Sequence, residues 1–296
     1  MDYLKKGKAF FLLFATFFMW GSIYVAGKMV SDIPAPVVAC IRCFIACFPL
    51  LLMSRKYLGT RIEKSDWKYF FVVGALGYFV TIFLIQVGIS LTGASMAALI
   101  NATTPIGITI FAVFLLHEKI TPVKILCLFL AIAGTVIITM GTETRGELMG
   151  MAAVLAAVIS FSIASCYMRK LTAKYPPVLV TTYGMIISMI FHIPTAIISA
   201  VGAGGIHFEA RHLLVLLYLG FIGSGLAQYT WTSALQLLPA STCSLFYPLQ
   251  PMFAALLGAL LLHESFTPTF FIGLILISFD VILSTLETRK LQQQAN

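Results

Sequence analysis

Charged residues are scarce in this sequence. Only 10% of its 296 residues are Asp, Glu, Lys or Arg, whereas soluble domains usually carry about 25%. Hydrophobic residues make up 60% of the chain, and its mean hydropathy is +0.99. So little charge excludes an ordinary soluble domain, because water is not the main solvent of such a chain.

Motifs that would support catalysis are also missing. The sequence has no HExxH zinc site, no GxSxG nucleophile elbow and no cluster of acids inside its apolar runs. We therefore expect neither an enzyme nor a bound cofactor.

Cysteine is infrequent, and all six cysteines fall inside apolar runs, so disulfides are not expected. Cys40, Cys43 and Cys47 share one face of a predicted helix, a placement that could hold a soft metal ion. The alternative is that they pack as small apolar side chains. We favour packing and predict no metal site.

What the sequence does have is a series of long apolar runs. A helix needs roughly 20 mostly apolar residues to cross a bilayer. Runs near that length occupy residues 9–30, 34–54, 68–90, 93–116, 122–141, 147–168, 177–200, 211–236, 240–262 and 268–286. We therefore predict an all-α integral membrane protein with ten transmembrane helices, in which the first run is an uncleaved span and not a signal peptide.

The basic residues indicate how these spans are oriented, because Lys and Arg near span ends favour the cytoplasmic side. With the N-terminus in the cytoplasm, Arg42 lies inside a span, and the outer side holds only Lys28, Arg145 and Arg211. We predict a multi-pass protein of the inner (plasma) membrane with both termini in the cytoplasm. The basic residues form no patch with interleaved aromatics, so no nucleic-acid partner is expected.

One segment of the chain occurs twice. Residues 94–122 align without gaps on residues 240–268 at a constant spacing of 146. The matched pairs include Pro105 with Pro251, His117 with His263, and Glu118 with Glu264. Hydrophobicity alone does not explain shared Pro, His and Glu, so we infer a duplication. The preceding parts match more weakly at a spacing near 141, which places Arg42 on Tyr183.

These matches predict two five-helix repeats, residues 1–141 and 142–288, followed by a short cytoplasmic tail at 289–296. An odd number of spans in each copy forces the copies into opposite orientations across the bilayer. Inverted repeats are a recurrent plan of secondary transporters, in which the substrate site lies near the midplane where the halves meet.

Polar residues inside the predicted spans are candidates for a substrate site, because polar groups in a bilayer usually face the bundle interior, a cavity or each other. Asn101 and Thr104 share a helical face in the fourth span, and the repeat places Tyr247 and Gln250 at the matching positions of the ninth. Aromatic rings can stack on a flat substrate or surround a cation. The predicted substrate-binding residues are Trp20, Tyr24, Arg42, Tyr78, Asn101, Phe161, Gln228, Trp231, Tyr247 and Gln250.

Each of these residues has a structural alternative. An aromatic residue near a span end is often an interfacial anchor, and buried amides such as Asn101, Gln228 and Gln250 can hydrogen-bond between helices. Arg42 could bind a substrate carboxylate through its planar fork of donors, or it could cap helix carbonyls or snorkel to the interface. Lys28 could serve the same anion, with snorkelling as its alternative.

Other ionisable residues in the spans have less support. His192 and Asp280 are candidate proton carriers, since ionisable groups within a membrane can relay protons. No pair of buried carboxylates accompanies them, so nothing else in the sequence supports proton coupling. Glu118 and Glu264 end the fourth and ninth spans, where we expect them to cap helices or form gate contacts.

Several motifs resemble those of a known family. They are Trp20-Gly21-Ser22 in the first span, the two prolines followed by leucine-rich runs into Glu118 and Glu264, and the Thr-Pro starts of spans five and ten. Together they resemble the drug/metabolite transporter superfamily, specifically its ten-helix EamA-type exporters. In that family a glycine commonly follows the Glu by nine residues; Gly273 matches this, whereas Cys127 departs from it.

The resemblance implies an inner-membrane carrier that works by alternating access and often exports amino acids, related metabolites or drugs. We expect export of a small zwitterion or amphiphile such as an amino acid, with Arg42 favouring a carboxylate. The alternative ligand is an organic cation or drug held by Trp20, Trp231 and Tyr247. A membrane-embedded enzyme or a channel is the alternative of another class. The expected partners are the substrate and membrane lipid, and the expected state is a monomer.

Overall fold

The computed structural model describes most of the chain. The described residues are 2–117, 145–206, 208–244, 246–247 and 249–263, with single residues or pairs at 122, 125–126, 129, 268, 271–272, 275–276, 279 and 283. Within them every regular element is helical. The predicted spans at 122–141 and 268–286 fall almost wholly outside these residues, as do Glu118, Cys127, Glu264 and Asp280.

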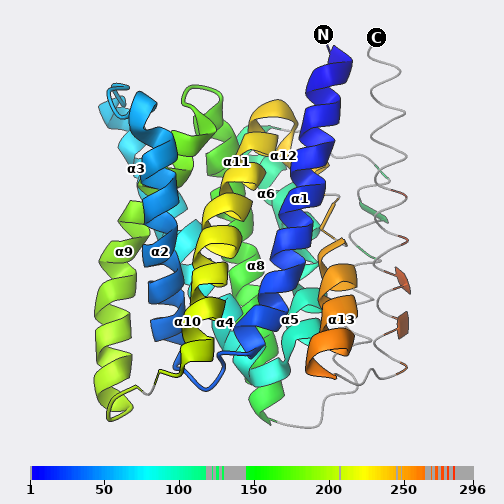
Figure 1. Cartoon of the computed structure of the whole chain (residues 1–296). Helices are drawn as coiled ribbons and strands as arrows, with labels where there is room; N and C mark the ends of the chain where they lie inside the picture. The colour runs from blue at the N-terminus through cyan, green and yellow to red at the C-terminus, as the bar shows by residue number, and fades with distance from the viewer. Residues whose placement is uncertain are drawn as a thin grey trace.

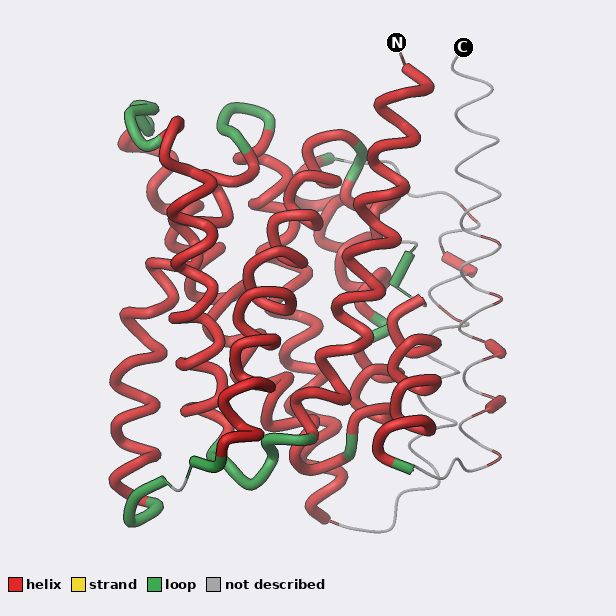
Figure 2. Tube along the Cα trace, in the orientation of Figure 1, coloured by secondary structure: helices red, strands yellow, loops and turns green. Residues whose placement is uncertain are grey.

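Eight helical segments in the described part of the chain are long and apolar enough to cross a membrane. They cover Gly7–Lys28, Ala35–Tyr57, Lys64–Thr92, Ala94–Leu116, Glu147–Thr172, Pro177–Gly202, Ala210–Leu237 and Ala240–Leu262. Each coincides, within a few residues, with one of the predicted apolar runs. The helices run along one common direction in a single bundle (Figure 1), and their connections gather at its two ends (Figure 2).

The bundle exposes many large apolar side chains and buries many polar ones beside its apolar core. Phe11, Phe114 and Ile198 are 71–73% exposed, whereas Arg42 and Gln86 are at most 2% exposed. In water this distribution would be unfavourable, but in a bilayer the outer surface meets hydrocarbon and the polar groups must find partners in the interior.

Two of the helices begin in the same way. Helix α2 (Ala35–Ser54) follows Pro34, and α9 (Pro177–Gly202) follows Pro176. These prolines have nearly equal backbone angles, φ −53° and ψ 131° against φ −57° and ψ 136°. Proline suits a helix start because its fixed φ is close to the helical value. The N–H that it lacks would have no partner within the helix at this position.

Two spans contain π-helical segments in their middle. In one, η3 (Val73–Val80) lies between α3 (Trp67–Val72) and α4 (Thr81–Thr92). In the other, η4 (Leu219–Leu226) lies between α10 (Ala210–Tyr218) and α11 (Ala227–Leu237). The two segments have equal length and are 146 residues apart, the spacing of the sequence repeat. Such wide turns are rare and occur often at functional sites.

Glycines in the π-helical segments allow close contacts with neighbouring helices. A Cβ at Gly74 would lie 2.8 Å from the carbonyl oxygen of Gly184 on α9, and a Cβ at Gly220 would lie 3.1 Å from that of Arg42 on α2. Gly74 and Gly220 are equivalent in the repeat, so the residues that they contact, Gly184 and Arg42, are also equivalent. The sequence comparison at a spacing of 141 placed Arg42 on Tyr183, one residue earlier.

Two further spans are interrupted. One consists of α5 (Ala94–Asn101) and α6 (Thr104–Leu116), and the other of α12 (Ala240–Ser244) and α13 (Leu249–Leu262). His117 and His263, which follow α6 and α13, both have left-handed backbones, with φ of 56° and 54°. The interruptions bring backbone carbonyls and polar side chains to the middle of the bundle, where α1 (Asp2–Lys28) and α8 (Arg145–Thr172) contact them.

Candidate functional site

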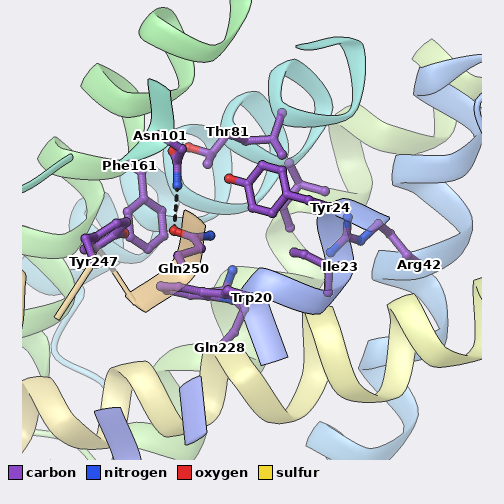
Figure 3. A pocket seen from close by; sticks show the side chains of 12 residues that line it. Trp20, Ile23, Tyr24, Arg42, Thr81, Asn101, Phe161, Gln228, Tyr247 and Gln250 are labelled. Atoms are coloured by element: carbon purple, nitrogen blue, oxygen red, sulfur yellow. Dashed lines mark hydrogen bonds between the residues drawn. The ribbon is translucent and has the colours of Figure 1, made fainter. Parts of the chain in front are cut away.

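A pocket lies in the interior of the bundle where α1, α2, α4, α5, α8, α11 and α13 meet. Its cavity volume is about 40 Å³, which is room for a few water molecules and is below the roughly 300–1,000 Å³ usual for small-ligand sites. Its lining residues are Trp20, Ile23, Tyr24, Arg42, Thr81, Ile82, Ile85, Asn101, Phe161, Gln228, Tyr247 and Gln250. The structure thus brings together all the predicted binding residues except Tyr78 and Trp231 (Figure 3).

An amide bridge crosses the pocket. The Nδ2 of Asn101, at the end of α5, donates to the Oε1 of Gln250 at 3.1 Å (Figure 3). The hydroxyl of Thr104 also lies 3.4 Å from the Oδ1 of Asn101. The helix-to-helix hydrogen bond proposed as an alternative for these amides is therefore present, and the same amides line the pocket. A polar ligand could exchange hydrogen bonds with them without leaving a buried amide unpaired.

Aromatic rings form one wall of the pocket. The ring of Trp20 lies 5.5 Å from that of Phe161 and 6.0 Å from that of Tyr247, measured between centroids. Trp231 packs behind this wall, 5.5 Å from Trp20, and is fully buried. Trp231 is not among the residues that line the pocket, and its ring lies 5.5–5.9 Å from those of Trp20, Phe161 and Tyr247.

Tyr78 lies in η3 and does not line the pocket. Its hydroxyl is 4.0 Å from the sulfur of Met168, and its ring fills the contact beside Gly184 on α9. The wide π-helical turn places this side chain on the packed face of its span. Tyr78 therefore packs against neighbouring helices and is not among the residues that line the pocket.

The opposite wall carries Arg42, which projects from α2 and lies across the pocket from Phe161 and Tyr247 (Figure 3). The residue is 2% exposed, so its side chain does not snorkel to the surface. Its Nε donates to the hydroxyl of Ser224 in η4 at 2.7 Å. Every ion pair among the described residues involves Lys174, Arg211 or His212, and none involves Arg42.

A buried guanidinium without a carboxylate is costly, because removing a charge from water is compensated only by good partners. Arg42 has five N–H donors, and a single neutral hydroxyl accepts from its Nε. An anionic group entering the pocket would supply the missing partner through two parallel hydrogen bonds.

The other ionisable candidates lie away from the pocket. The Nζ of Lys28 is 3.4 Å from the carbonyl oxygen of Ser90, and the Nε2 of His192 is 3.2 Å from that of Tyr78. Neither residue lines the pocket. His192 is fully buried and Lys28 only partly so.

Four lining residues escaped the sequence analysis: Ile23, Thr81, Ile82 and Ile85. Isoleucines in an apolar span give no sign of facing a cavity, and the sequence analysis did not single out Thr81 among the polar residues of its span. The repeat does hold such a sign, because Ile82 lies 146 residues before Gln228 and Ile85 lies 146 residues before Trp231. Applying the 146-residue spacing to the predicted binding residues Gln228 and Trp231 would have identified Ile82 and Ile85.

Comparison with known proteins agrees with this architecture. The model of the EamA-like transporter family matches residues 7–140 and 148–286. The chain is 25% identical to the uncharacterized transporter YetK of Bacillus subtilis, over 97% of this chain and 89% of that protein. It is 26% identical to the uncharacterized inner membrane transporter YicL of Salmonella typhimurium, over 98% of each. A crystal structure with 19% sequence identity superposes with a TM-score of 0.72, covering 96% of this chain and 99% of the other. Because the family model matches most of the chain, the chain belongs to the EamA-like transporter family.

Proposed function

We propose that this protein is a secondary transporter that exports a small zwitterion, such as an amino acid, by alternating access. Membership in the EamA-like transporter family supports transport. The repeated π-helical segments and helix breaks support a carrier of ten transmembrane helices, built from two inverted five-helix repeats that enclose the pocket. Outward transport is what the resemblance to EamA-type exporters implies.

Arg42 is the observation that carries the substrate class. It lines the pocket, is almost fully buried, and has no carboxylate partner among the described residues. A substrate carboxylate would complete its hydrogen bonds, and the aromatic wall opposite offers π faces to an ammonium or to an apolar side chain. A zwitterion carries groups suited to both walls.

An organic cation or drug is the second candidate. The rings of Trp20, Phe161 and Tyr247 lie on the pocket and could surround such a cation. Arg42 would then repel the ligand, so this candidate requires the cation to occupy only the aromatic end of the pocket.

Flux measurements separate the two substrates. Purified protein in liposomes is tested with labelled amino acids and with quaternary amines, as wild type, Arg42→Ala and Trp20→Ala. The zwitterion proposal expects amino-acid flux that Arg42→Ala removes. Arg55→Ala is the matched control, since Arg55 is exposed. Cation flux that survives Arg42→Ala and disappears in Trp20→Ala would establish the second candidate instead.

The membrane setting follows from the same proposal. The distribution of basic residues supports an inner-membrane protein with both termini in the cytoplasm. Because two repeats in one chain can enclose a complete pocket, we propose a monomer whose partners are its substrate and membrane lipid. The proposed cycle uses no cofactor, chemical reaction or nucleic acid. Reporter fusions at the two termini and a mass measurement in detergent test the topology and the monomer.

A further inference from the structure

In the part of the chain that the structure describes, two clusters of ion-pairing side chains lie outside the pocket, at opposite ends of the bundle. One joins the α8–α9 turn to the connection that precedes α3, and the other joins the α1–α2 turn to the start of α10. The first pair of connections lies at the end where the chain begins, and the second pair lies at the other end (Figures 1 and 2). In the proposed repeat arrangement each cluster connects one half to the other.

The cluster at the first end is centred on Lys174 and is named here the lysine latch. The Nζ of Lys174 lies 3.1 Å from a carboxylate oxygen of Glu63 and 3.1 Å from one of Asp66. The hydroxyl of Tyr175 donates to Asp66 at 2.8 Å and accepts from the backbone N–H of Glu63 at 3.1 Å. The side chain of Asp66 is only 6% exposed.

The cluster at the other end is centred on Asp32 and is named here the aspartate latch. One carboxylate oxygen of Asp32 lies 3.1 Å from the Nε2 of His212 and 3.7 Å from the Nη2 of Arg211. Arg211 also pairs with Glu209 at 2.7 Å. The Nδ1 of His212 accepts the backbone N–H of Glu209 at 3.1 Å, so the ring proton is assigned to Nε2, the atom beside Asp32.

The two latches occupy matching positions of the repeat. Glu63 and Asp66 stand 146 residues before Glu209 and His212. In both pairs the backbone N–H of the later residue donates to the carbonyl of the earlier one at 3.0 Å. The local backbone at the starts of these two spans is therefore the same.

The residue types at the matching positions differ: Lys174 matches Asp32 and Asp66 matches His212, whereas Glu63 and Glu209 are both acidic. Lys174 and Asp32 each stand two residues before the proline that precedes α9 or α2. In the lysine latch a basic turn residue meets an acid at the helix start, and in the aspartate latch an acidic turn residue meets His212. The pairing across the halves is preserved although the residue types are not, which favours a role for the pairing itself.

We propose that the two clusters are the latches of the transport cycle, and that the lysine latch is the stronger, so that the substrate-free protein opens preferentially at the aspartate end. This inference rests on the proposed alternating access. Each latch holds one end closed and separates when that end opens. The pairings of both latches are present in this structure.

The difference in strength follows from the hydrogen bonds that each latch makes. Asp66 accepts hydrogen bonds from Lys174 and Tyr175. In the aspartate latch the Nε2 of His212 has no hydrogen-bond partner although it lies 3.1 Å from Asp32, and the 3.7 Å pair of Asp32 and Arg211 joins two exposed side chains, which contributes little. Opening at the lysine end therefore costs more.

Accessibility of the pocket tests this directly. The reporter is Ile85→Cys, because Ile85 lines the pocket, in a variant whose six native cysteines are Ala. Its reaction rate with a membrane-impermeant thiol reagent is measured in right-side-out and in inverted vesicles. We expect faster labelling from the aspartate end, and we expect Lys174→Glu to increase labelling from the lysine end about tenfold. Adding Asp66→Lys and Glu63→Lys should restore the original rates, and Lys170→Glu is the matched control.

The outcomes distinguish the latches from the carrier proposal. Labelling from one side only, in every variant, would overturn alternating access and with it the latches. Labelling from both sides at rates that Lys174→Glu does not change would overturn the latches and leave the carrier intact. Because the charge-reversed triple variant keeps opposite charges together, recovery there shows that Lys174→Glu acts through the pairing and not through misfolding.

Discussion

The two halves of the chain share backbone features that their pocket side chains do not. The π-helical segments η3 and η4, the starts of the interrupted spans at α5 and α12, and the left-handed histidines after α6 and α13 all recur at one spacing. At that same spacing Asn101 matches Tyr247, and Ile82 matches Gln228. All four of these side chains line the pocket.

The difference shows which parts of the molecule serve which purpose. Wide turns and broken helices permit bending and close approach, which both halves of a carrier need in order to move. The pocket side chains determine which ligand binds. A ligand without twofold symmetry requires different side chains from the two halves. Arg42 illustrates this most clearly, since the packing of the π-helical segments matches it with Gly184, which has no side chain to offer.

The largest effect is expected from removing the charge of Arg42, which has no charged counterpart in the other half. Arg42→Ala should reduce the affinity for a carboxylate substrate about 100-fold, since removing one partner of a buried charge pair typically costs about 2–5 kcal/mol. Substrate-induced thermal stabilisation in detergent measures this, with Arg55→Ala as the exposed control. Equal affinity in wild type and Arg42→Ala would show that the asymmetry between the halves at this position is unrelated to the ligand.

The next effect tests the backbone that the halves share. Gly74→Ala and Gly220→Ala each force a Cβ against a neighbouring helix, with the closest atoms at 2.7 Å and 2.5 Å. We expect both to destabilise the protein by about 1–3 kcal/mol, as for other overpacked sites. Thermal unfolding in detergent measures the loss, and Gly202→Ala is the helical control because no atom lies within 4 Å of its added Cβ. Destabilisation by only one of the two substitutions would show that η3 and η4 do not pack against their neighbouring helices in equivalent ways.

A smaller effect is expected at the amide bridge between the halves. Asn101→Ala, Gln250→Ala and the double variant form a thermodynamic cycle for their 3.1 Å hydrogen bond. The coupling energy should be about 0.5–1.5 kcal/mol, the usual net value of a hydrogen bond. Additive losses in unfolding free energy would mean that the amides act independently.

The smallest effect concerns the lysine latch. The hydrogen bond to Asp66 and, to a smaller extent, the hydrogen bond to Glu63 raise the pKa of Lys174. A raised pKa means that the charged lysine stabilises the folded state at neutral pH and that this contribution is lost as the pH rises through the folded-state pKa, above 10.5. Lys174→Met should therefore flatten the alkaline decline of the melting temperature slightly, relative to Lys170→Met. An identical decline in both variants would contradict the assigned pairing.

The sequence predicted the eight spans that the structure describes and most of the residues that line the pocket. Apolar runs set the described spans, because hydrocarbon thickness fixes their length. The repeat identified Asn101, Tyr247 and Gln250 together, because amides and prolines at one spacing are informative where apolar residues are not.

Other features depend on geometry that hydropathy does not encode. Tyr78 sits within η3, where the wider turn rotates side chains away from the face expected from a period of 3.6 residues. Trp231 does not line the pocket, and its ring packs against the rings of Phe17, Trp20, Phe161 and Tyr247. The latches join turns distant in sequence, and a charged turn residue alone does not reveal its partner.

Competition between an amino acid and its methyl ester tests most directly whether Arg42 binds a substrate carboxylate. In liposomes, uptake of a labelled amino acid that the wild type transports is measured with increasing amounts of either unlabelled compound. Our account predicts that the free acid competes and the ester, which lacks the negative charge, does not. An ester that competes as strongly as the acid would contradict it.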